Sequence, residues 1–388
     1  MGTSALSFDF ATAARILFGE GRVREAGAIA AELGSHALLV ESGSDRTEVL
    51  IAVLHEHGVA TTRFPVAGEP TTTLVQEGAE RARRDGCDHV IAFGGGSVID
   101  AGKAVAALMT NREPLIEYLE VVGGARPLTE ASVPMIAVPT TAGTGAEVTR
   151  NAVLMVEQSR VKVSLRSPSM LPAVAIVDPE LTYSLPPDVT ASTGLDALTQ
   201  CLEPFVSPKG NPITDAVARE GIRRAAGALR RVVRDGGDVE ARRDMAIASL
   251  CGGLALANAK LGAVHGFAAP LGGMFPVPHG VACARLLAPV AAANVRALRE
   301  RTPVSRALVR YQEVARVLTG RADAVAEDGV DWLAALVEEL AVPRLGTYGV
   351  RTSDVGGVVE QAKRASSMQG NPVALSDEEL AEALGAAL

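Results

Sequence analysis

Cysteine pairs, basic stretches and aromatic residues are all scarce in this chain. Aromatic residues make up 3% of it, against 48% hydrophobic and 21% charged residues, a globular composition without a disorder signature. The net charge of −8, without a long basic run, argues against nucleic acid or an anionic membrane as a partner. The four cysteines are widely spaced and form no CxxC pair, which argues against a disulfide framework and a structural zinc knuckle. We expect four buried, reduced thiols: Cys87, Cys201, Cys251 and Cys283.

Targeting signals are also lacking. The first residues show neither the basic start nor the continuous apolar run of a signal peptide. No segment of about 20 residues is free of both charges and helix breakers, so we expect no transmembrane helix. A length of 388 residues predicts two or three domains, and we expect a cytoplasmic protein.

Short apolar runs alternate with helical patterns in the first half of the chain, which predicts an α/β domain with a parallel sheet. The predicted strands are Ala37–Val40, Thr61–Phe64, His89–Phe93, Met135–Val138 and Val174–Asp178, and the helices between them are Arg46–His57, Leu74–Arg84 and Ser97–Met109. After Pro186 and Pro187 long Ala/Leu/Arg-rich patterns dominate, such as Pro212–Val233, Val239–Ala259 and Val304–Thr319. We therefore expect a nucleotide-binding α/β domain over residues 1–187 and an all-helical second domain over 188–388.

A glycine-rich turn is the first functional signal. Gly94, Gly95, Gly96 and Ser97 follow an apolar strand and open a helix. Glycines let a backbone approach a phosphate, and a helix start offers unpaired N–H groups. A tight strand-to-helix turn without a ligand is the alternative.

Two further segments suit a dinucleotide. Pro139–Thr149 also follows a strand and is rich in glycine and hydroxyl groups. Glu41 ends a strand, where a carboxylate suits a ribose 2′-hydroxyl and repels a 2′-phosphate, which favours NAD over NADP.

A possible metal site lies further along. The segment Leu261–Ala284 has no Asp, Glu, Lys or Arg and holds two of the six histidines, His265 and His279. Its prolines and glycines argue against a continuous helix, so we expect an irregular segment that forms the wall of an active site. Asp196 and Gln200 share one helix face at i and i+4 and complete a set suited to zinc or ferrous iron. The alternative is a capping aspartate and two structural histidines.

Together these segments resemble the iron-containing (group III) alcohol dehydrogenase family, which has a dehydroquinate-synthase-like fold. The resemblance covers nearly the whole chain and is carried by Gly94–Ala104, Pro139–Val153, Val177–Pro187, Thr193–Ser207 and Leu261–Gly280. It implies an N-terminal α/β cofactor domain, an all-α metal-binding domain and an active site in the cleft between them. The chain is similar, more distantly, to maleylacetate reductases, which use no metal.

The resemblance also implies roles by position. Metal ligands would be Asp196, His265 and His279; the pyrophosphate region would be Gly95, Gly96, Ser97 and Asp100; the strip beside the nicotinamide would be Thr140, Thr141, Thr144, Val153 and Lys162. Two positions depart from the family pattern, because Gln200 and Ala269 stand where many members have histidine. Gln200 could still offer an amide oxygen to the metal, whereas Ala269 removes a group that handles protons.

The expected reaction is reversible hydride transfer between NAD(H) and a small alcohol/carbonyl pair, assisted by Fe²⁺ or Zn²⁺. His265, His279 and Lys162 are the candidate catalytic residues. Substrate is expected to be a small alcohol or aldehyde, and Arg150, Lys162, Arg166 and Lys260 are candidates for holding a carboxylate or phosphonate on it.

Alternatives are a metal-free maleylacetate-type reductase, an NAD- and metal-dependent sugar-phosphate cyclase, and a metabolite-binding protein without activity. An edge strand around Ala13–Phe18 is expected to pair across a two-fold axis in a homodimer.

Overall fold

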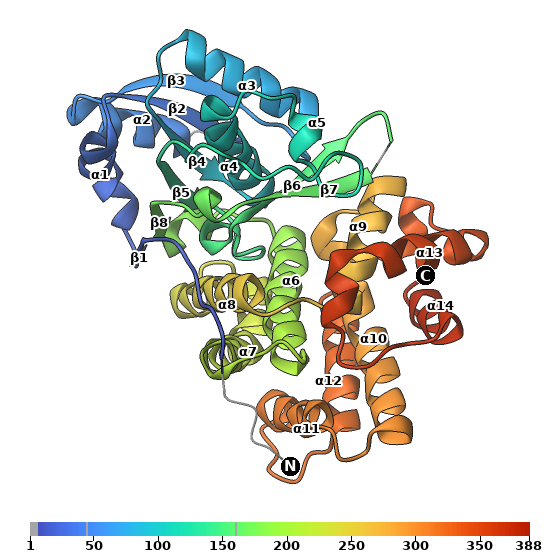
Figure 1. Cartoon of the computed structure of the whole chain (residues 1–388). Helices are drawn as coiled ribbons and strands as arrows, with labels where there is room; N and C mark the ends of the chain where they lie inside the picture. The colour runs from blue at the N-terminus through green and yellow to red at the C-terminus, as the bar shows by residue number, and fades with distance from the viewer. Residues whose placement is uncertain (1–6, 44–45, 160) are drawn as a thin grey trace.

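The first half of the chain forms a six-stranded parallel sheet (Figure 1). The computed structural model describes residues 7–43, 46–159 and 161–388. The strands are β1 (Arg15–Phe18), β2 (His36–Glu41), β3 (Ala60–Pro65), β4 (His89–Gly94), β5 (Met135–Pro139) and β8 (Val174–Val177), in the order β1-β8-β5-β4-β2-β3. The strand around Ala13–Phe18 is thus present, and it occupies one edge of the sheet beside β8.

Helices cover both faces of this sheet. Leu39 packs in one hydrophobic cluster with side chains of α1 (Ala26–Leu33) and α2 (Arg46–Glu56). Its neighbours Leu38 and Val40 point to the other face, against α3 (Thr72–Arg84) and α4 (Gly96–Thr110). Burial on both faces explains why the strands are apolar throughout rather than alternating.

A two-stranded antiparallel hairpin, which the sequence patterns did not predict, follows the fifth sheet strand. It consists of β6 (Asn151–Val156) and β7 (Val161–Arg166), and it reaches from the sheet towards α9 (Ala263–Met274), as Figure 1 shows. β6 alternates strictly between buried and half-buried residues, the pattern of a strand with one covered face. The hairpin therefore places β7 beside the helical half.

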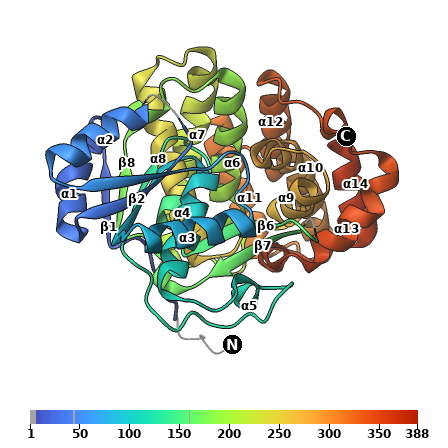
Figure 2. The ribbon, with the colours of Figure 1, turned by 90° about the horizontal axis from the view of Figure 1, so that it is seen from above.

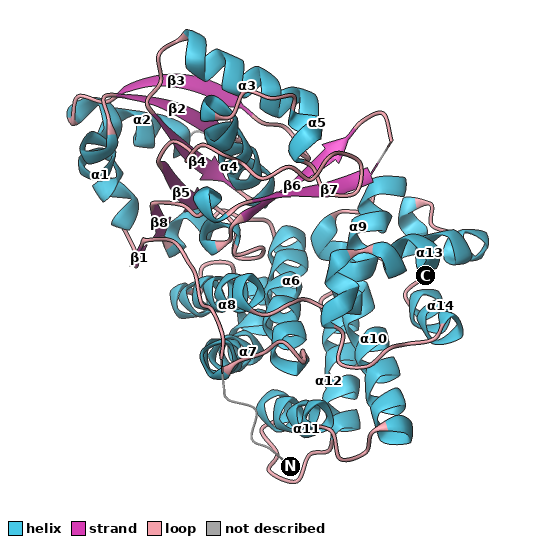
Figure 3. Ribbon diagram, in the orientation of Figure 1, coloured by secondary structure: helices cyan, strands magenta, loops and turns pink. Residues whose placement is uncertain are grey.

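The second half is all-helical, as Figure 3 shows by colour. In addition to α9, this half contains the helices α6 (Pro187–Val206), α7 (Pro212–Arg234), α8 (Val239–Asn258), α10 (His279–Arg301), α11 (Arg306–Thr319), α12 (Ala326–Glu339), α13 (Val355–Arg364) and α14 (Asp377–Ala386). Seen from above, α12–α14 lie on the far side of the molecule from α1 and α2 (Figure 2). The predicted fold class, a parallel α/β half followed by a helical half, is confirmed, and we propose residue 187 as the boundary between two domains.

The segment Leu261–Ala284 differs from the prediction of an irregular wall. It forms the helix α9, a short break at residues 275–278 and the start of α10. Pro270 lies inside α9, where buried Phe267 and Leu271 pack into the core. Burial of that apolar face outweighs the backbone hydrogen bond that proline removes.

Helix α10 is long and apolar enough to pass a test for a membrane span by length and composition alone. In the structure 83% of its apolar stretch is buried inside the protein. α8 and α9 pass the same test only as a pair, and they meet at an angle of 97°. The burial of α10 is that of the central helix of a packed helical domain.

Candidate metal and cofactor site

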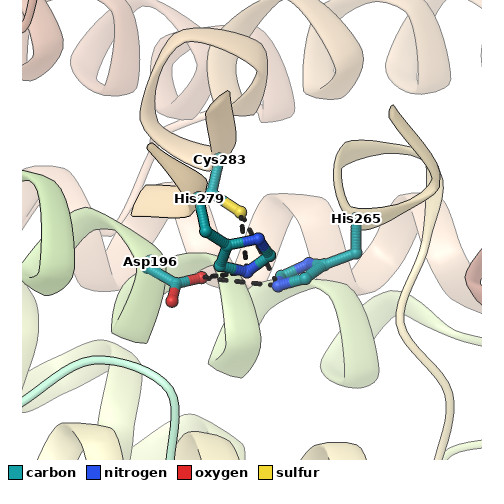
Figure 4. Close-up of side chains that lie close together, drawn as sticks. All are labelled: Asp196, His265, His279 and Cys283. Carbon is teal, nitrogen blue, oxygen red and sulfur yellow. Dashed lines mark hydrogen bonds and ion pairs between the residues drawn. The ribbon is translucent and has the colours of Figure 1, made fainter. Parts of the chain in front are cut away.

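Four side chains from three helices converge in the helical half (Figure 4). Asp196 comes from the middle of α6, and His265 lies in the first turn of α9. His279 begins α10, and Cys283 follows it by one helical turn. One potential ligand atom of each residue lies within 4.8 Å of the others.

The spacing of these atoms suits a shared ion better than direct hydrogen bonds. The Oδ1 atom of Asp196 lies 3.4 Å from Nε2 of His265 and 3.8 Å from Nε2 of His279. That oxygen is buried and has no hydrogen-bond partner. An unpartnered buried carboxylate oxygen facing two imidazole nitrogens fits a divalent cation such as Zn²⁺ or Fe²⁺.

Glu203 orients the first histidine. Its Oε2 accepts a hydrogen bond from Nδ1 of His265 at 2.7 Å, and its Oε1 accepts one from the backbone N–H of Val264 at 2.8 Å. A proton on Nδ1, assigned from this contact, leaves the lone pair of Nε2 facing Asp196. Sequence reasoning missed Glu203, although its place seven residues after Asp196 puts both on one face of α6.

The surroundings shift the pKa values of all four groups. Burial works to raise the pKa of Asp196, but His279 and His265 outweigh it and lower the pKa to about 2. Burial opposes the charged form of His265 too, yet Cys283, Asp196 and Glu203 raise the pKa of His265 well above its ordinary value. Burial lowers the pKa of His279 and raises that of Cys283 to about 12. Without a metal the site therefore favours an ionised Asp196 and a second proton on His265, which metal binding would displace.

Gln200 is close by but is held through its amide nitrogen. Its Nε2 donates to the backbone oxygen of Gly143 at 3.2 Å, which links α6 to the loop after β5. Its Oε1 is buried without a hydrogen-bond partner. Ligation of a metal by Gln200 remains a prediction that would use this free oxygen.

The two glycine-rich segments lie side by side at the carboxyl ends of β4 and β5. The N–H of Thr140 donates to the oxygen of Gly94 at 2.9 Å. A Cβ on Gly96 would lie 2.7 Å from the side chain of Thr144, so only glycine fits there without a shift. α4 begins at this turn with Gly95 at its cap and no side chain bonded to its first N–H groups.

This turn suits a pyrophosphate, since ligands of open α/β sheets bind at the carboxyl ends of strands and helix starts attract anions. Ser97, Thr141 and Thr144 are half-buried around it. Their predicted contacts with a cofactor remain predictions.

Asp100 and Val153 meet, but in a structural network. Oδ2 of Asp100 accepts the N–H of Val153 at 3.0 Å, and its Oδ1 lies 3.2 Å from Nζ of Lys103. Lys103 is fully buried and also donates to Thr149 at 2.8 Å. Burial raises the pKa of Asp100 and lowers that of Lys103, although each opposes the shift of the other. Asp100 thereby anchors the hairpin to α4, and its predicted contact with pyrophosphate is left as a prediction.

Glu41 ends β2 as predicted, and its carboxylate already has several partners. Oε1 accepts from Arg63 at 2.8 Å and 3.0 Å. Oε2 accepts from the N–H of Gly43 at 3.0 Å and the hydroxyl of Thr47 at 2.9 Å. A ribose hydroxyl would have to share these oxygens, and Arg63 brings a positive charge to the same edge.

Of the four basic candidates for substrate binding, Lys162 is the one whose charge acts on a residue of the metal cluster. From β7 its Nζ reaches Gly272 of α9 and pairs with Glu69 at 2.9 Å. Its charge contributes, after burial, to the low pKa of His279. Nζ of Lys260 instead bonds the side chain of Gln369 at 2.6 Å. Arg166 is exposed and Arg150 half-buried.

Comparison with known proteins supports the class that this fold and site indicate. Residues 13–179 match the family described as "Iron-containing alcohol dehydrogenase", and residues 190–388 match "Fe-containing alcohol dehydrogenase family, C-terminal". A choline dehydrogenase of Bacillus subtilis (strain 168) is 35% identical over 370 residues, which cover 93% of this chain and 90% of that protein.

Two solved structures have the same fold along their whole length. A 1,3-propanediol oxidoreductase matches with a TM-score of 0.91 at 33% identity, over 99% of this chain and 100% of that one. A sulfoacetaldehyde reductase from Bifidobacterium kashiwanohense, in complex with NAD⁺, matches with a TM-score of 0.86 at 31% identity, over 99% of both chains.

The chain belongs to the iron-containing alcohol dehydrogenase family, as its motifs predicted. It is accordingly an oxidoreductase that acts on CH–OH groups.

Proposed function

We propose that this protein is an NAD-dependent, metal-dependent alcohol dehydrogenase or aldehyde reductase for a small alcohol/carbonyl pair. The observation that carries the proposal is the convergence of buried Asp196 and His265 with half-buried His279, with the unpartnered oxygen of Asp196 among them. When bound, the metal would act as a Lewis acid on the substrate oxygen, and NAD(H) would exchange the hydride.

The residues of the chain position these groups. Asp196 and the Nε2 atoms of His265 and His279 would hold the ion, while Glu203 keeps Nδ1 of His265 protonated. The turn Gly94–Ser97 and the start of α4 would hold the pyrophosphate. We assign Thr140, Thr141, Thr144 and Val153 to the strip beside the nicotinamide and ribose.

Protons must still reach solvent, because Ala269 offers no exchangeable group. Lys162 supplies a nearby ammonium, and its pairing with Glu69 at 2.9 Å gives it a partner that leads towards the surface, since Glu69 is 43% exposed. We propose Lys162, water or a ribose hydroxyl as the route. In Lys162→Met, a fall in kcat with unchanged NADH binding and unchanged KM for the substrate supports the lysine, and an unchanged kcat favours water or the ribose.

We propose NAD rather than NADP, on the strength of the buried carboxylate of Glu41 at the end of β2. The similarity to a reductase solved with NAD⁺ supports this choice. A substrate carrying an anionic group is also proposed, with Lys162 as its closest basic partner.

We further propose a cytoplasmic homodimer in which the β1 edges of two sheets pair. Analytical ultracentrifugation of the wild type and of an Ile16→Pro variant tests the dimer. The N–H groups of Arg15 and Gly19 bond β8, so that of Ile16 faces the free edge, and proline removes it as a donor.

The central experiment is NADH oxidation with small aldehydes, before and after chelation and metal return. Stoichiometric conversion of NADH that is lost on chelation and restored by Zn²⁺ or Fe²⁺ supports the proposal. Full activity after chelation would instead favour a metal-free reductase, and product formation without net NADH consumption would favour a cyclase.

A further inference from the structure

The thiol of Cys283 lies among the atoms that face the proposed ion. Its Sγ is 3.7 Å from Nε2 of His265 and 3.6 Å from Nε2 of His279, and the side chain is fully buried (Figure 4). A thiol has one proton, so it can donate to only one of these nitrogens at a time. The nearby Oδ1 of Asp196 has no hydrogen bond at all. Hydrogen bonding therefore does not account for the way the four atoms converge.

A tetrahedral ion does account for it. Zinc binds nitrogen or oxygen at about 2.0–2.2 Å and sulfur at about 2.3 Å, so neighbouring donors of a tetrahedral site lie about 3.3–3.8 Å apart. The four separations here are 3.4 Å and 3.8 Å from the carboxylate and 3.7 Å and 3.6 Å from the sulfur. The other two pairs of donor atoms lie within 4.8 Å of each other, so one ion placed among the four atoms would have all of them as near neighbours.

The local sequence favours this arrangement. Cys283 follows His279 by four residues on α10, so both side chains lie on one helix face. Gln200 bonds Gly143 through its amide nitrogen, so only its Oε1, which has no partner, could face the ion.

We infer that Cys283 is a fourth protein ligand of the metal, so that the site is an Asp/His/His/Cys set selective for Zn²⁺ over Fe²⁺. This inference rests on the proposed metal-dependent function. Metal binding replaces the S–H proton, which passes to solvent, with a metal–sulfur bond. Thiolate is a soft ligand that favours zinc over ferrous iron, and zinc accepts a fifth neighbour, which leaves room for a substrate oxygen.

Cobalt(II) is the direct probe, because a cobalt–thiolate bond gives a near-ultraviolet charge-transfer band that nitrogen and oxygen ligands do not give. The metal-free full-length protein, Cys283→Ser and Cys283→Ala are titrated with Co²⁺ alone. Cys251→Ser is the matched control, a buried thiol on α8 outside the cluster. We expect the band in the wild type and in Cys251→Ser, and its loss in both Cys283 variants while the visible cobalt bands persist.

Visible cobalt bands without a charge-transfer band in the wild type would overturn Cys283 as a ligand while leaving the metal site intact. No cobalt binding at all would overturn both this inference and the metal-dependent part of the proposed function. NADH oxidation by the same samples reports separately on the proposed reaction.

A second measurement tests selectivity. In anaerobic competition between Zn²⁺ and Fe²⁺, we expect the preference of the wild type for zinc to fall by at least about 10-fold in Cys283→Ser, the lower end of what even an outer-shell change costs. The Cys251→Ser protein should keep the wild-type ratio. An unchanged ratio in Cys283→Ser would contradict the inference.

Discussion

The contact between Glu203 and His265 leads to the most specific prediction. Glu203 is 4% exposed and accepts two N–H groups, from Nδ1 of His265 at 2.7 Å and from Val264 at 2.8 Å. Glu203→Gln keeps the size of the side chain but leaves one oxygen for two donors. Whichever N–H faces the new amide group loses its acceptor, and the imidazole loses its orienting charge.

Loss of such an outer-shell carboxylate typically costs about 10–100-fold in metal affinity. We expect the affinity of Glu203→Gln for Zn²⁺ to fall by this factor, which corresponds to about 1.4–2.7 kcal/mol. The measurement is a zinc titration against a chromophoric chelator. Thermal unfolding without metal checks that the variant folds.

Glu300→Gln is the control, because Glu300 is exposed on α10 and no contact with the cluster is seen. A folded Glu203→Gln protein with wild-type zinc affinity would refute the role given to Glu203. A loss of equal size in Glu300→Gln would show a general charge effect instead.

Three further predictions concern the cofactor half. Burial raises the pKa of Glu147 from 4.5 to about 7 despite Lys103, so the unfolded chain ionises first and stability falls as pH rises from about 4.5 to 7. Glu147→Gln should remove this fall in the free energy of unfolding, which is worth about 3 kcal/mol. Urea unfolding of both proteins at pH 5 and pH 8 measures the fall. The same pH dependence in the wild type and in Glu147→Gln would contradict the prediction. Lys103→Met should lower the free energy of unfolding by about 3–5 kcal/mol, because it leaves the carboxylate of Asp100 buried without its partner. Adding Asp100→Asn should restore part of this stability. A Lys103→Met protein as stable as the wild type would refute the role of the buried pair. Glu41→Ala frees Arg63 and should shift the ratio of kcat/KM for NAD over NADP towards NADP by at least about 10-fold. A shift of this size corresponds to about one charge-assisted hydrogen bond. An unchanged ratio would reject the role assigned to Glu41.

The strands and helices with long, regular patterns were predictable from the sequence. Apolar runs such as His89–Phe93 became central strands because both faces of the sheet are covered. The hairpin was missed, although β6 alternates in burial, because its half-buried face carries apolar residues such as Val153 and Met155. Pro270 was given too much weight as a helix breaker, since packing of α9 decides its conformation.

The site was partly predictable for a different reason. Histidine and aspartate are rare enough in apolar segments that His265, His279 and Asp196 stand out in the sequence, and the structure brings these three together. All four cysteines are free and buried as expected, and Cys283 in addition lies at the cluster. What distinguishes Cys283 from an ordinary core cysteine is its short distance to residues on other helices. Spacing along the sequence does not reveal that distance.

Metal content per chain tests the central claim most directly. It is measured by inductively coupled plasma mass spectrometry on protein purified without chelator and with minimal exposure to air. We predict close to one divalent ion per chain in the wild type, lost in His265→Ala, and NADH oxidation that follows the metal. Metal-free protein that still oxidises NADH with an aldehyde would contradict the account and would leave His265 and His279 as proton-transfer or substrate-binding groups.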